Sequence, residues 1–373
     1  MKLNYRFLLL AMVGIFVFFL SVPEEVGIFK LTHWLFTYEF GFIKRGLIGS
    51  IISMLNCQPS YGFLVSCALI VNAALLIVLL AFVSRCLSPK GNISWFLFNL
   101  LFICSSATIA HFSYDLGRFD QFGLLILLLS LIILGQKAEL KWFIVLLFMI
   151  GILIHEAFFF LFFPFITMLA YYVLRSHPNQ KLFVTILSST MLIALTIISL
   201  YGHMTLDSKT YADILVSRSG LPLSGNSSVI LILYRSLEEN IAFSLIKYTK
   251  ETLFNHIKLL IWQFPVFLLL LSMLHSLYFT AIRLKENNYF ILMLAGTLTP
   301  FLLYPLGHDF FRWISVVITN IFLLILFLSK DKRYFQNIKD ITARYKYLII
   351  IALIISLVIG PIGVTTPFPS PLF

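Results

Sequence analysis

The chain of 373 residues carries 27 Lys and Arg against 16 Asp and Glu, and 60% of its residues are hydrophobic, including 39 phenylalanines. Only 12% of the residues are charged and the mean hydropathy is +0.98, a composition that excludes a soluble globular protein. In a soluble protein the net charge of +11 would suggest nucleic acid. Here we take it to reflect membrane orientation, and we expect no nucleic-acid partner.

Apolar runs of the length that a hydrocarbon core of about 30 Å requires recur along the chain. We predict an all-α, polytopic helical bundle that forms a single membrane domain over residues 1–373, with about eleven transmembrane helices. The predicted runs are 7–22, 62–84, 93–110, 121–136, 142–154, 157–174, 182–201, 258–282, 288–305, 313–329 and 347–361. The run at 142–154 is short and should form a hairpin with the next run, turning at His155 and Glu156.

Two connections are long. The first outer loop, 23–61, contains a stretch at 46–55 that is too short to span and return, so we predict an interfacial or re-entrant helix there. The second long outer loop, 202–257, begins with a polar, turn-rich half and continues into an amphipathic stretch near 229–253.

Basic residues fix the expected orientation. The loop at 330–346 alone holds Lys330, Lys332, Arg333, Lys339, Arg344 and Lys346. By the positive-inside rule this loop and the N-terminus are cytoplasmic, and most carboxylates then face outward. The inward carboxylates are Glu139, Glu286, Asp331 and Asp340. Pro23-Glu24-Glu25 follows the first run in place of a cleavage site, so that run is predicted to be a retained helix.

Four polar clusters interrupt the apolar runs at their outward ends. In the first, Glu39 precedes Lys44 and Arg45, with Gly41, Gly46 and Gly49 nearby. Arg is suited to bidentate recognition of phosphate, so we interpret Lys44 and Arg45 as a phosphate or pyrophosphate clamp. The alternative is that both side chains reach to lipid headgroups without further function.

In the second cluster, Asp115, Arg118 and Asp120 close the short loop between the third and fourth runs. They could position an acceptor hydroxyl, bind a divalent cation or form a local ion pair. One loop offers too few carboxylates for a metal, which would have to recruit Glu39 or Asp309. We therefore predict no cofactor or metal, with a divalent cation as an open alternative.

The third cluster is the His155-Glu156 pair in the turn of the short hairpin. Such a pair can act as a general base, or it can simply cap helix backbone groups. In the fourth, His308, Asp309 and Arg312 precede the tenth run. Asp309 and Arg312 are spaced i,i+3, so they can bind substrate or pair with each other.

Carboxylates and arginines gathered on the outward face suit a lipid-linked anionic substrate. A polyprenyl-diphosphate sugar offers a diphosphate for Arg and Lys and hydroxyls for a carboxylate to deprotonate. We predict Glu39, Asp115, Asp120, His155 and Glu156 as catalytic residues, and Lys44, Arg45, Arg118, His308, Asp309 and Arg312 as substrate-binding residues. We expect Glu39, Arg45, Asp115, Arg118, Asp120, Asp309 and Arg312 to converge on one outward cavity.

The chain resembles the bacterial O-antigen polymerase group, and its layout is similar to that of the wider polytopic class-C glycosyltransferases. The likeness lies in the number of runs, the Phe, Ile and Leu richness and the long late outer loop. Glu39, Asp115 and Asp120 resemble the acidic residues of the first two outer loops in such transferases. The outer-loop arginines resemble those that polymerases use to hold the lipid-linked donor.

The resemblance implies a glycosyltransferase of the bacterial inner membrane that polymerises O-antigen or capsule-type repeat units carried on polyprenyl diphosphate. Its expected partners are that lipid-linked glycan, membrane lipid and other polysaccharide-assembly membrane proteins. Alternatives are a class-C glycosyltransferase that uses a polyprenyl-phosphate sugar and a transporter or flippase for lipid-linked oligosaccharide. A structural subunit without catalysis would not need paired acid and Arg clusters.

Overall fold

The computed structural model of the chain describes residues 5–87, 92–136, 138–235, 239, 241–242 and 249–369, and these residues form helices and connecting turns. Within these ranges no strand occurs, and Ile362 and Pro367 form one isolated bridge. The helices of the bundle are α1 (Tyr5–Ser21), α4 (Tyr61–Cys86), α5 (Ile93–Cys104), α6 (Ile109–Tyr114), α7 (Asp120–Leu134), η3 (Ala138–Trp142), α8 (Phe143–Ile154), α9 (Phe158–Leu161), α10 (Phe163–Val173), α11 (Gln180–Tyr201), α15 (Lys250–Arg283), α16 (Asn287–Leu298), η4 (Thr299–Leu303), α17 (Phe310–Leu328) and α19 (Lys346–Ile359).

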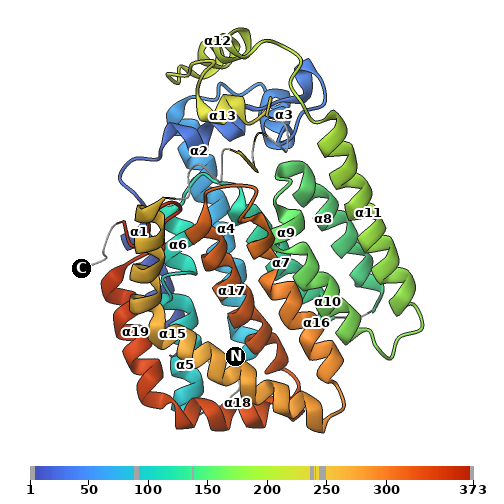
Figure 1. Cartoon of the computed structure of the whole chain (residues 1–373), viewed down its shortest axis with the longest axis vertical. Helices are drawn as coiled ribbons and strands as arrows, with labels where there is room; N and C mark the ends of the chain where they lie inside the picture. The colour runs from blue at the N-terminus through green and yellow to red at the C-terminus, as the bar shows by residue number, and fades with distance from the viewer. Residues whose placement is uncertain are drawn as a thin grey trace.

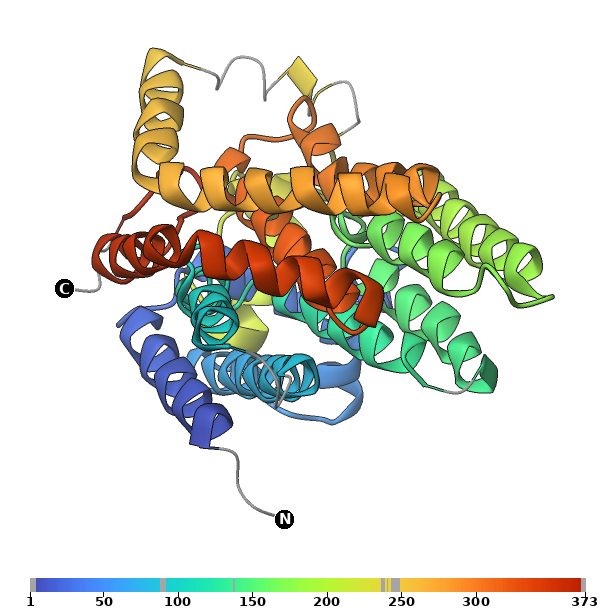
Figure 2. The same cartoon turned by 90° about the horizontal axis from the view of Figure 1, so that it is seen from below.

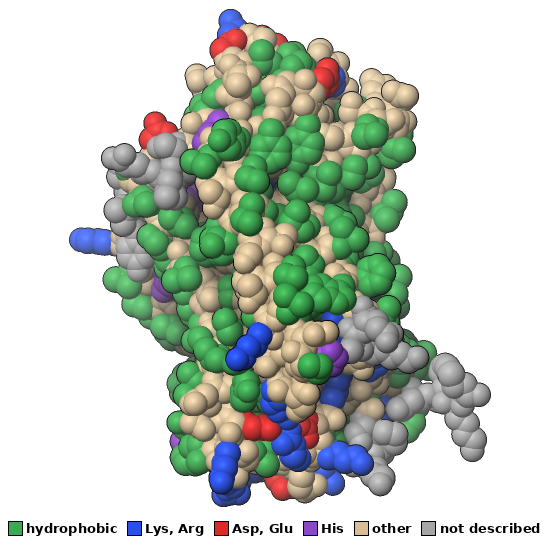
Figure 3. All heavy atoms as spheres, turned by 90° about the vertical axis from the view of Figure 1, so that its right-hand side faces the viewer, with side chains coloured by type: hydrophobic (Ala, Val, Ile, Leu, Met, Phe, Trp, Pro, Cys, Tyr) green, Lys and Arg blue, Asp and Glu red, His purple; other side chains and the backbone are tan. Residues whose placement is uncertain are grey.

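The two ends of the bundle differ. One end carries short elements that we call the cap: α2 (Ile28–Thr32), η1 (His33–Leu35), η2 (Tyr38–Phe40), α3 (Leu47–Met54), α12 (Ser208–Ser219) and α13 (Ser228–Leu231). The opposite end is crossed by α18 (Lys332–Arg344), and we call it the α18 end (Figure 1). On the face shown in Figure 3, hydrophobic side chains cover most of the middle, and Lys and Arg gather towards the α18 end.

Among the residues that the structure describes, five helices are long and apolar enough to cross a membrane: α4, the pair α5–α6 taken together, α11, α15 and α17. The pair α18–α19, bent by 75°, makes a sixth if it counts as one span. Five further apolar helices have only 10–17 residues. The structure thus supports an all-helical membrane protein, whereas eleven crossings are not confirmed. Each predicted run does contain a helix, but many of these helices are shorter than a straight crossing requires.

Helix α17 is the centre of the bundle. Every residue of α17 except Ile321 is buried, and the helix lies behind α15 in Figure 1 and inside the ring of helices in Figure 2. A helix that is apolar all round is typical of an interior position. Its few polar side chains therefore contact protein and determine what packs around it.

Two of those polar side chains donate hydrogen bonds to backbone carbonyl groups at breaks in neighbouring helices. Thr319 Oγ1 donates to the carbonyl of Ala107, between α5 and α6, at 2.8 Å. Asn320 Nδ2 donates to the carbonyl of Leu161, between α9 and α10, at 2.9 Å. Non-helical backbone at membrane depth is tolerated where protein groups satisfy it. The runs predicted as continuous at 93–110 and 157–174 are therefore broken helices.

The two long outer loops pack together to form the cap. The predicted short helix at 46–55 is α3, and its Gly49 packs so closely on η1 that a Cβ would lie 2.2 Å from the carbonyl oxygen of Phe36. The backbone amide of Lys44 donates to the carbonyl of Gly202 at 3.1 Å and so joins the first loop to the second. Much of the amphipathic stretch predicted near 229–253 lies outside the described residues.

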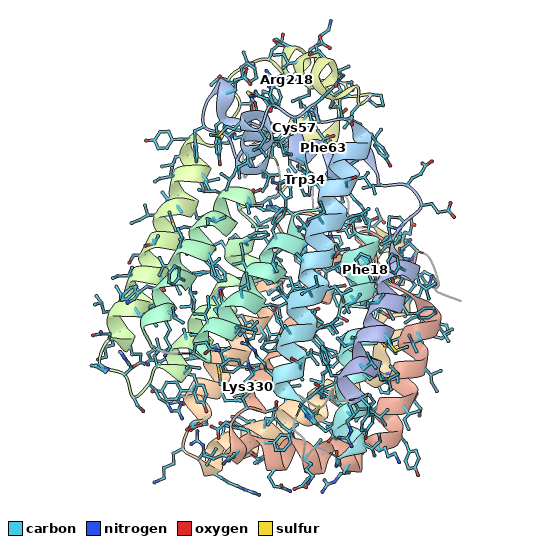
Figure 4. All side chains as sticks on the ribbon, turned by 180° about the vertical axis from the view of Figure 1, so that it is seen from behind. Phe18, Trp34, Cys57, Phe63, Arg218 and Lys330 are labelled. Atoms are coloured by element: carbon cyan, nitrogen blue, oxygen red, sulfur yellow. The ribbon has the colours of Figure 1, made fainter. Side chains whose placement is uncertain are left out.

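Arg218 and Cys57 lie at the cap end and Lys330 at the opposite end (Figure 4). If the cap faces outward, a cysteine at Ser224 should react with an impermeant maleimide on intact cells, and one at Gln336 should react only after permeabilisation. Cys57 is only half-buried, so both probes belong in a Cys57→Ser background. If the cysteine at position 336 were labelled on intact cells and the one at position 224 were not, the cap would face the cytoplasm.

Candidate functional site

Charged side chains from five separate segments meet where the cap joins the bundle. The segments are α2, the turn before α3, the loop between α6 and α7, the turn between α8 and α9, and the start of α17. We call the group the ionic network; its members are Lys30, Arg45, Asp115, Arg118, Asp120, His155, Glu156, Asp309 and Arg312. It combines four cations with four carboxylates and one histidine.

Arg312 is the deepest cation of the network. Its Nε and Nη2 atoms donate to the two carboxylate oxygens of Asp120, and Nη1 donates to Asp309 Oδ2 at 2.7 Å. The Arg312 side chain is only 7% exposed and that of Asp120 only 2%. Removing one partner of such a buried pair strands a charge, which costs several kcal/mol, so this contact is a structural constraint as well as a candidate binding feature.

Asp115 and Arg118 lie beside this pair. Arg118 Nη1 donates to Asp309 Oδ2 at 2.8 Å, and Arg118 Nε lies 3.2 Å from Asp115 Oδ2. Lys30 Nζ reaches Asp115 Oδ1 at 2.9 Å. Within the described ranges neither Asp115 oxygen has a well-aligned hydrogen bond. Asp115 is thus held mainly by the charges of Lys30 and Arg118.

The loop that carries these residues is fixed by Gly117. Gly117 has φ +92°, and its carbonyl accepts a hydrogen bond of 2.6 Å from Trp34 Nε1. A Cβ there would lie 3.3 Å from both Leu31 and Val26. Only glycine adopts this backbone without strain, so the cap and the α6–α7 loop are locked together at this position.

Arg45 brings the cap into the network through Glu156. Arg45 Nε donates to both Glu156 oxygens at 3.1 and 3.0 Å, and Nη2 also donates to Oε1. Arg45 has φ +65°, a conformation that non-glycine residues adopt at a cost of about 1–3 kcal/mol. Burial alone would raise the pKa of Glu156, but the charge of Arg45 and then the interaction with His155 hold it well below its usual value.

His155 connects Glu156 to Arg312. Its Nε2 accepts from Arg312 Nη2 at 3.3 Å, and its Nδ1 lies 3.2 Å from Glu156 Oε2. Nδ1 also accepts a hydrogen bond of 3.3 Å from the backbone amide of Ala157. Burial, followed by the charge of Arg45, lowers the pKa of His155 to about 4, which agrees with a neutral ring.

The structure brings together every predicted site residue except three. Glu39 does not join the network: it is 47% exposed and accepts from Arg218 of α12 at 2.7 and 2.9 Å. Glu39 thus pairs with an arginine of the second outer loop, and in the described part of the chain no ion pair joins it to a network residue. Lys44 is half-buried, and Glu156 acts on it by charge. His308 adjoins Asp309, whose pKa its charge helps to lower.

A cavity of about 490 Å³ lies away from the network, between α15 and the α18–α19 elbow at the α18 end. The shared outward cavity expected from the sequence stays a prediction.

Sequence reasoning missed three residues around the site: Lys30, His33 and Arg218. His33 is buried, and its ring packs against Phe29 and Phe36. A signal was present, since Lys30 and His33 are spaced i,i+3 in an otherwise apolar stretch. A second missed cluster lies at the α18 end, where Glu286 binds Tyr172, Arg175, Arg333 and Tyr334.

Among the residues that the structure describes, no group of three or more His, Cys, Asp or Glu side chains is placed to hold a metal ion. The network carboxylates are instead each paired with a Lys or Arg. Comparison with protein-family models, with curated proteins and with solved structures gave no match. The function therefore has to be argued from the geometry of the site.

The burial of the Arg312–Asp120 pair leads to a stability prediction. Asp120→Asn should lower the free energy of unfolding by about 3–5 kcal/mol, because it leaves a buried guanidinium short of charge. Glu39→Gln removes a partly exposed pair and should cost no more than about 1 kcal/mol. Thermal unfolding of the detergent-solubilised variants measures both, and equal losses would contradict the assignment of Arg312 as the deep charge.

The histidines predict a pH dependence of stability. The pKa of His33 is well below its usual value because of burial and then the charge of Arg45, and that of His155 is about 4. The unfolded chain therefore binds more protons than the folded one below about pH 6.5, so stability falls as pH drops, by about 1.4 kcal/mol per pH unit for each histidine.

Melting temperatures between pH 7.5 and 5 test this, because the carboxylates titrate lower. His155→Asn should flatten the decline, whereas His203→Asn, which changes an exposed histidine of the same end, should leave it intact. A decline as steep in His155→Asn as in the wild-type protein would show that this ring does not cause it.

Proposed function

We propose that the chain is a membrane-embedded glycosyltransferase that acts at the extracytoplasmic face on a polyprenyl-diphosphate-linked oligosaccharide and polymerises O-antigen or capsule-type repeat units. It would lie in a bacterial inner membrane with its N-terminus in the cytoplasm, the shorter apolar helices completing about eleven crossings. Its partners would be the lipid-linked glycan, membrane lipid and other polysaccharide-assembly proteins.

The observation that carries the proposal is the meeting of paired carboxylates and arginines at the cap end. Here Lys30, Arg45 and Arg118 form a rim that is 10–18% exposed, above the deeper Asp120–Arg312 pair. The rim offers basic groups within reach of a substrate, and the deeper pair holds them in place.

Lys44 adds a positive charge that the network does not balance. It is half-buried and no ion pair joins it to a carboxylate in the described part of the chain. Burial lowers its pKa, the charge of Glu156 offsets part of this effect, and the charge of Arg45 lowers the pKa further. An anion beside Lys44 and Arg45 would relieve both effects, which favours a diphosphate at this position.

The chemistry then divides between rim and interior. Lys44, Arg45 and Arg118 would hold the diphosphate and stabilise its charge as it leaves. Asp115, whose oxygens have no well-aligned hydrogen bond within the described ranges, is the favoured general base for the acceptor hydroxyl, with Glu156 as the alternative. Asp120 and Arg312 would position the other groups. Glu39, the other predicted catalytic carboxylate, is paired with Arg218 in the cap and would contact the substrate from that side.

Conservative variants test this division. Arg45→Lys keeps the charge but loses the planar bidentate donor, and Asp115→Asn keeps the shape but cannot accept a proton. Each should shorten or abolish the polysaccharide ladder of a deletion strain complemented with the variant, with membrane levels of the protein unchanged. Asp213→Asn, the same chemical change on an exposed residue of α12, serves as the control.

The lipopolysaccharide of the deletion strain distinguishes a polymerase from an assembly transferase or a transporter. Lipopolysaccharide that carries a single repeat unit on its core would support polymerisation, whereas loss of the whole unit would indicate an assembly transferase or a transporter. Wild-type ladders from both Arg45→Lys and Asp115→Asn would leave the network with a structural role only.

A further inference from the structure

A second polar site lies far from the network, in the groove between α15 and the α18–α19 elbow. Leu271, His275, Phe279 and Arg283 follow one another at intervals of four residues, so they form one stripe along α15. Across the groove lie Arg344 and Tyr345, at the 75° bend between α18 and α19. Figure 2 shows α15 running alongside α18 at this end.

Hydrogen bonds join α15 to α18 beside the groove. Ser276 Oγ donates to Asn337 Oδ1, and Asn337 Nδ2 donates to the carbonyl of Ser276, both at 3.1 Å. Ser276 also lines the groove, whose volume is about 490 Å³.

The groove contains two arginines, Arg283 and Arg344. Across the described ranges, neither forms an ion pair or a side-chain hydrogen bond. Glu286, close to Arg283 in the sequence, binds Arg175 and Arg333, and Asp340, close to Arg344, accepts from Gln336. Two unmatched cations in one groove favour an anionic ligand.

The apolar side of the groove indicates what kind of anion fits. Leu271 is 64% exposed and Phe279 is 48% exposed, and both belong to α15, a helix of spanning length. An apolar wall that continues onto a membrane-spanning surface suits an acyl chain, while Arg283, Arg344 and His275 suit a phosphate group. We propose that this groove binds the headgroup of an anionic phospholipid.

Lipid-dependent thermal stabilisation of the purified full chain in a neutral detergent tests the proposal, with phosphatidylglycerol, phosphatidylcholine and inorganic phosphate as separate additions. Phosphatidylglycerol should raise the melting temperature in a saturable way, and the other two should not. The double variant Arg283→Gln/Arg344→Gln should weaken the apparent affinity for phosphatidylglycerol by about thirtyfold, since each basic group near an anionic headgroup contributes about fivefold.

The control is Lys181→Gln/Lys332→Gln, which removes the same charge from exposed residues outside the groove and should keep wild-type affinity. Equal stabilisation by phosphatidylcholine, or an unchanged affinity in the groove variant, would overturn the proposal. Equal stabilisation by inorganic phosphate would overturn the lipid as the occupant. The measurement needs no glycosyl transfer, so its outcome is independent of the function proposed for the network.

Discussion

The arrangement of the outer half of the molecule depends on the burial of Arg312. A guanidinium in a low-dielectric interior costs several kcal/mol unless carboxylates and hydrogen bonds compensate it. Arg312 sits in the first turn of the central helix and takes its compensation from Asp120, the first residue of α7, and from Asp309. Helices α7 and α17 must therefore start at the same level, and the segments that carry the remaining charges join them there.

The same central helix also accounts for the broken helices around it. Thr319 and Asn320 lie about two turns beyond Arg312 and satisfy carbonyls at the α5–α6 and α9–α10 breaks. The segments next to these breaks, the α6–α7 loop and the α8–α9 turn, carry Asp115 and Glu156 of the network. One helix thus supplies the deep charge at its start and the backbone hydrogen bonds further along, so a change in its register would disturb both.

The sequence predicted the all-helical class, the position of the apolar runs and most of the network, because hydropathy and the cost of intramembrane charge are local signals. It did not predict the helix breaks, because the carbonyl groups left free at each break are satisfied by side chains of another helix. These side chains are Thr319 and Asn320 of α17. The sequence also did not predict which carboxylate pairs with which arginine. Glu39 lies six residues before Arg45, yet it pairs with Arg218, and Arg45 pairs with Glu156, which only the packing of the two outer loops determines.

The neutrality of the network couples binding to reactivity under the proposed function. The four cations are already matched by four carboxylates, so a diphosphate can gain Arg45 or Arg118 only by taking it from Glu156 or Asp309. These arginines are also what lowers the pKa of each carboxylate against the opposing effect of burial. Once the arginine turns to the phosphate, burial raises the pKa of the released carboxylate and strengthens it as a base. With Glu156 as the base, the alternative to Asp115, proton transfer would therefore begin only when the donor is in place, which limits unproductive proton transfer in the empty site.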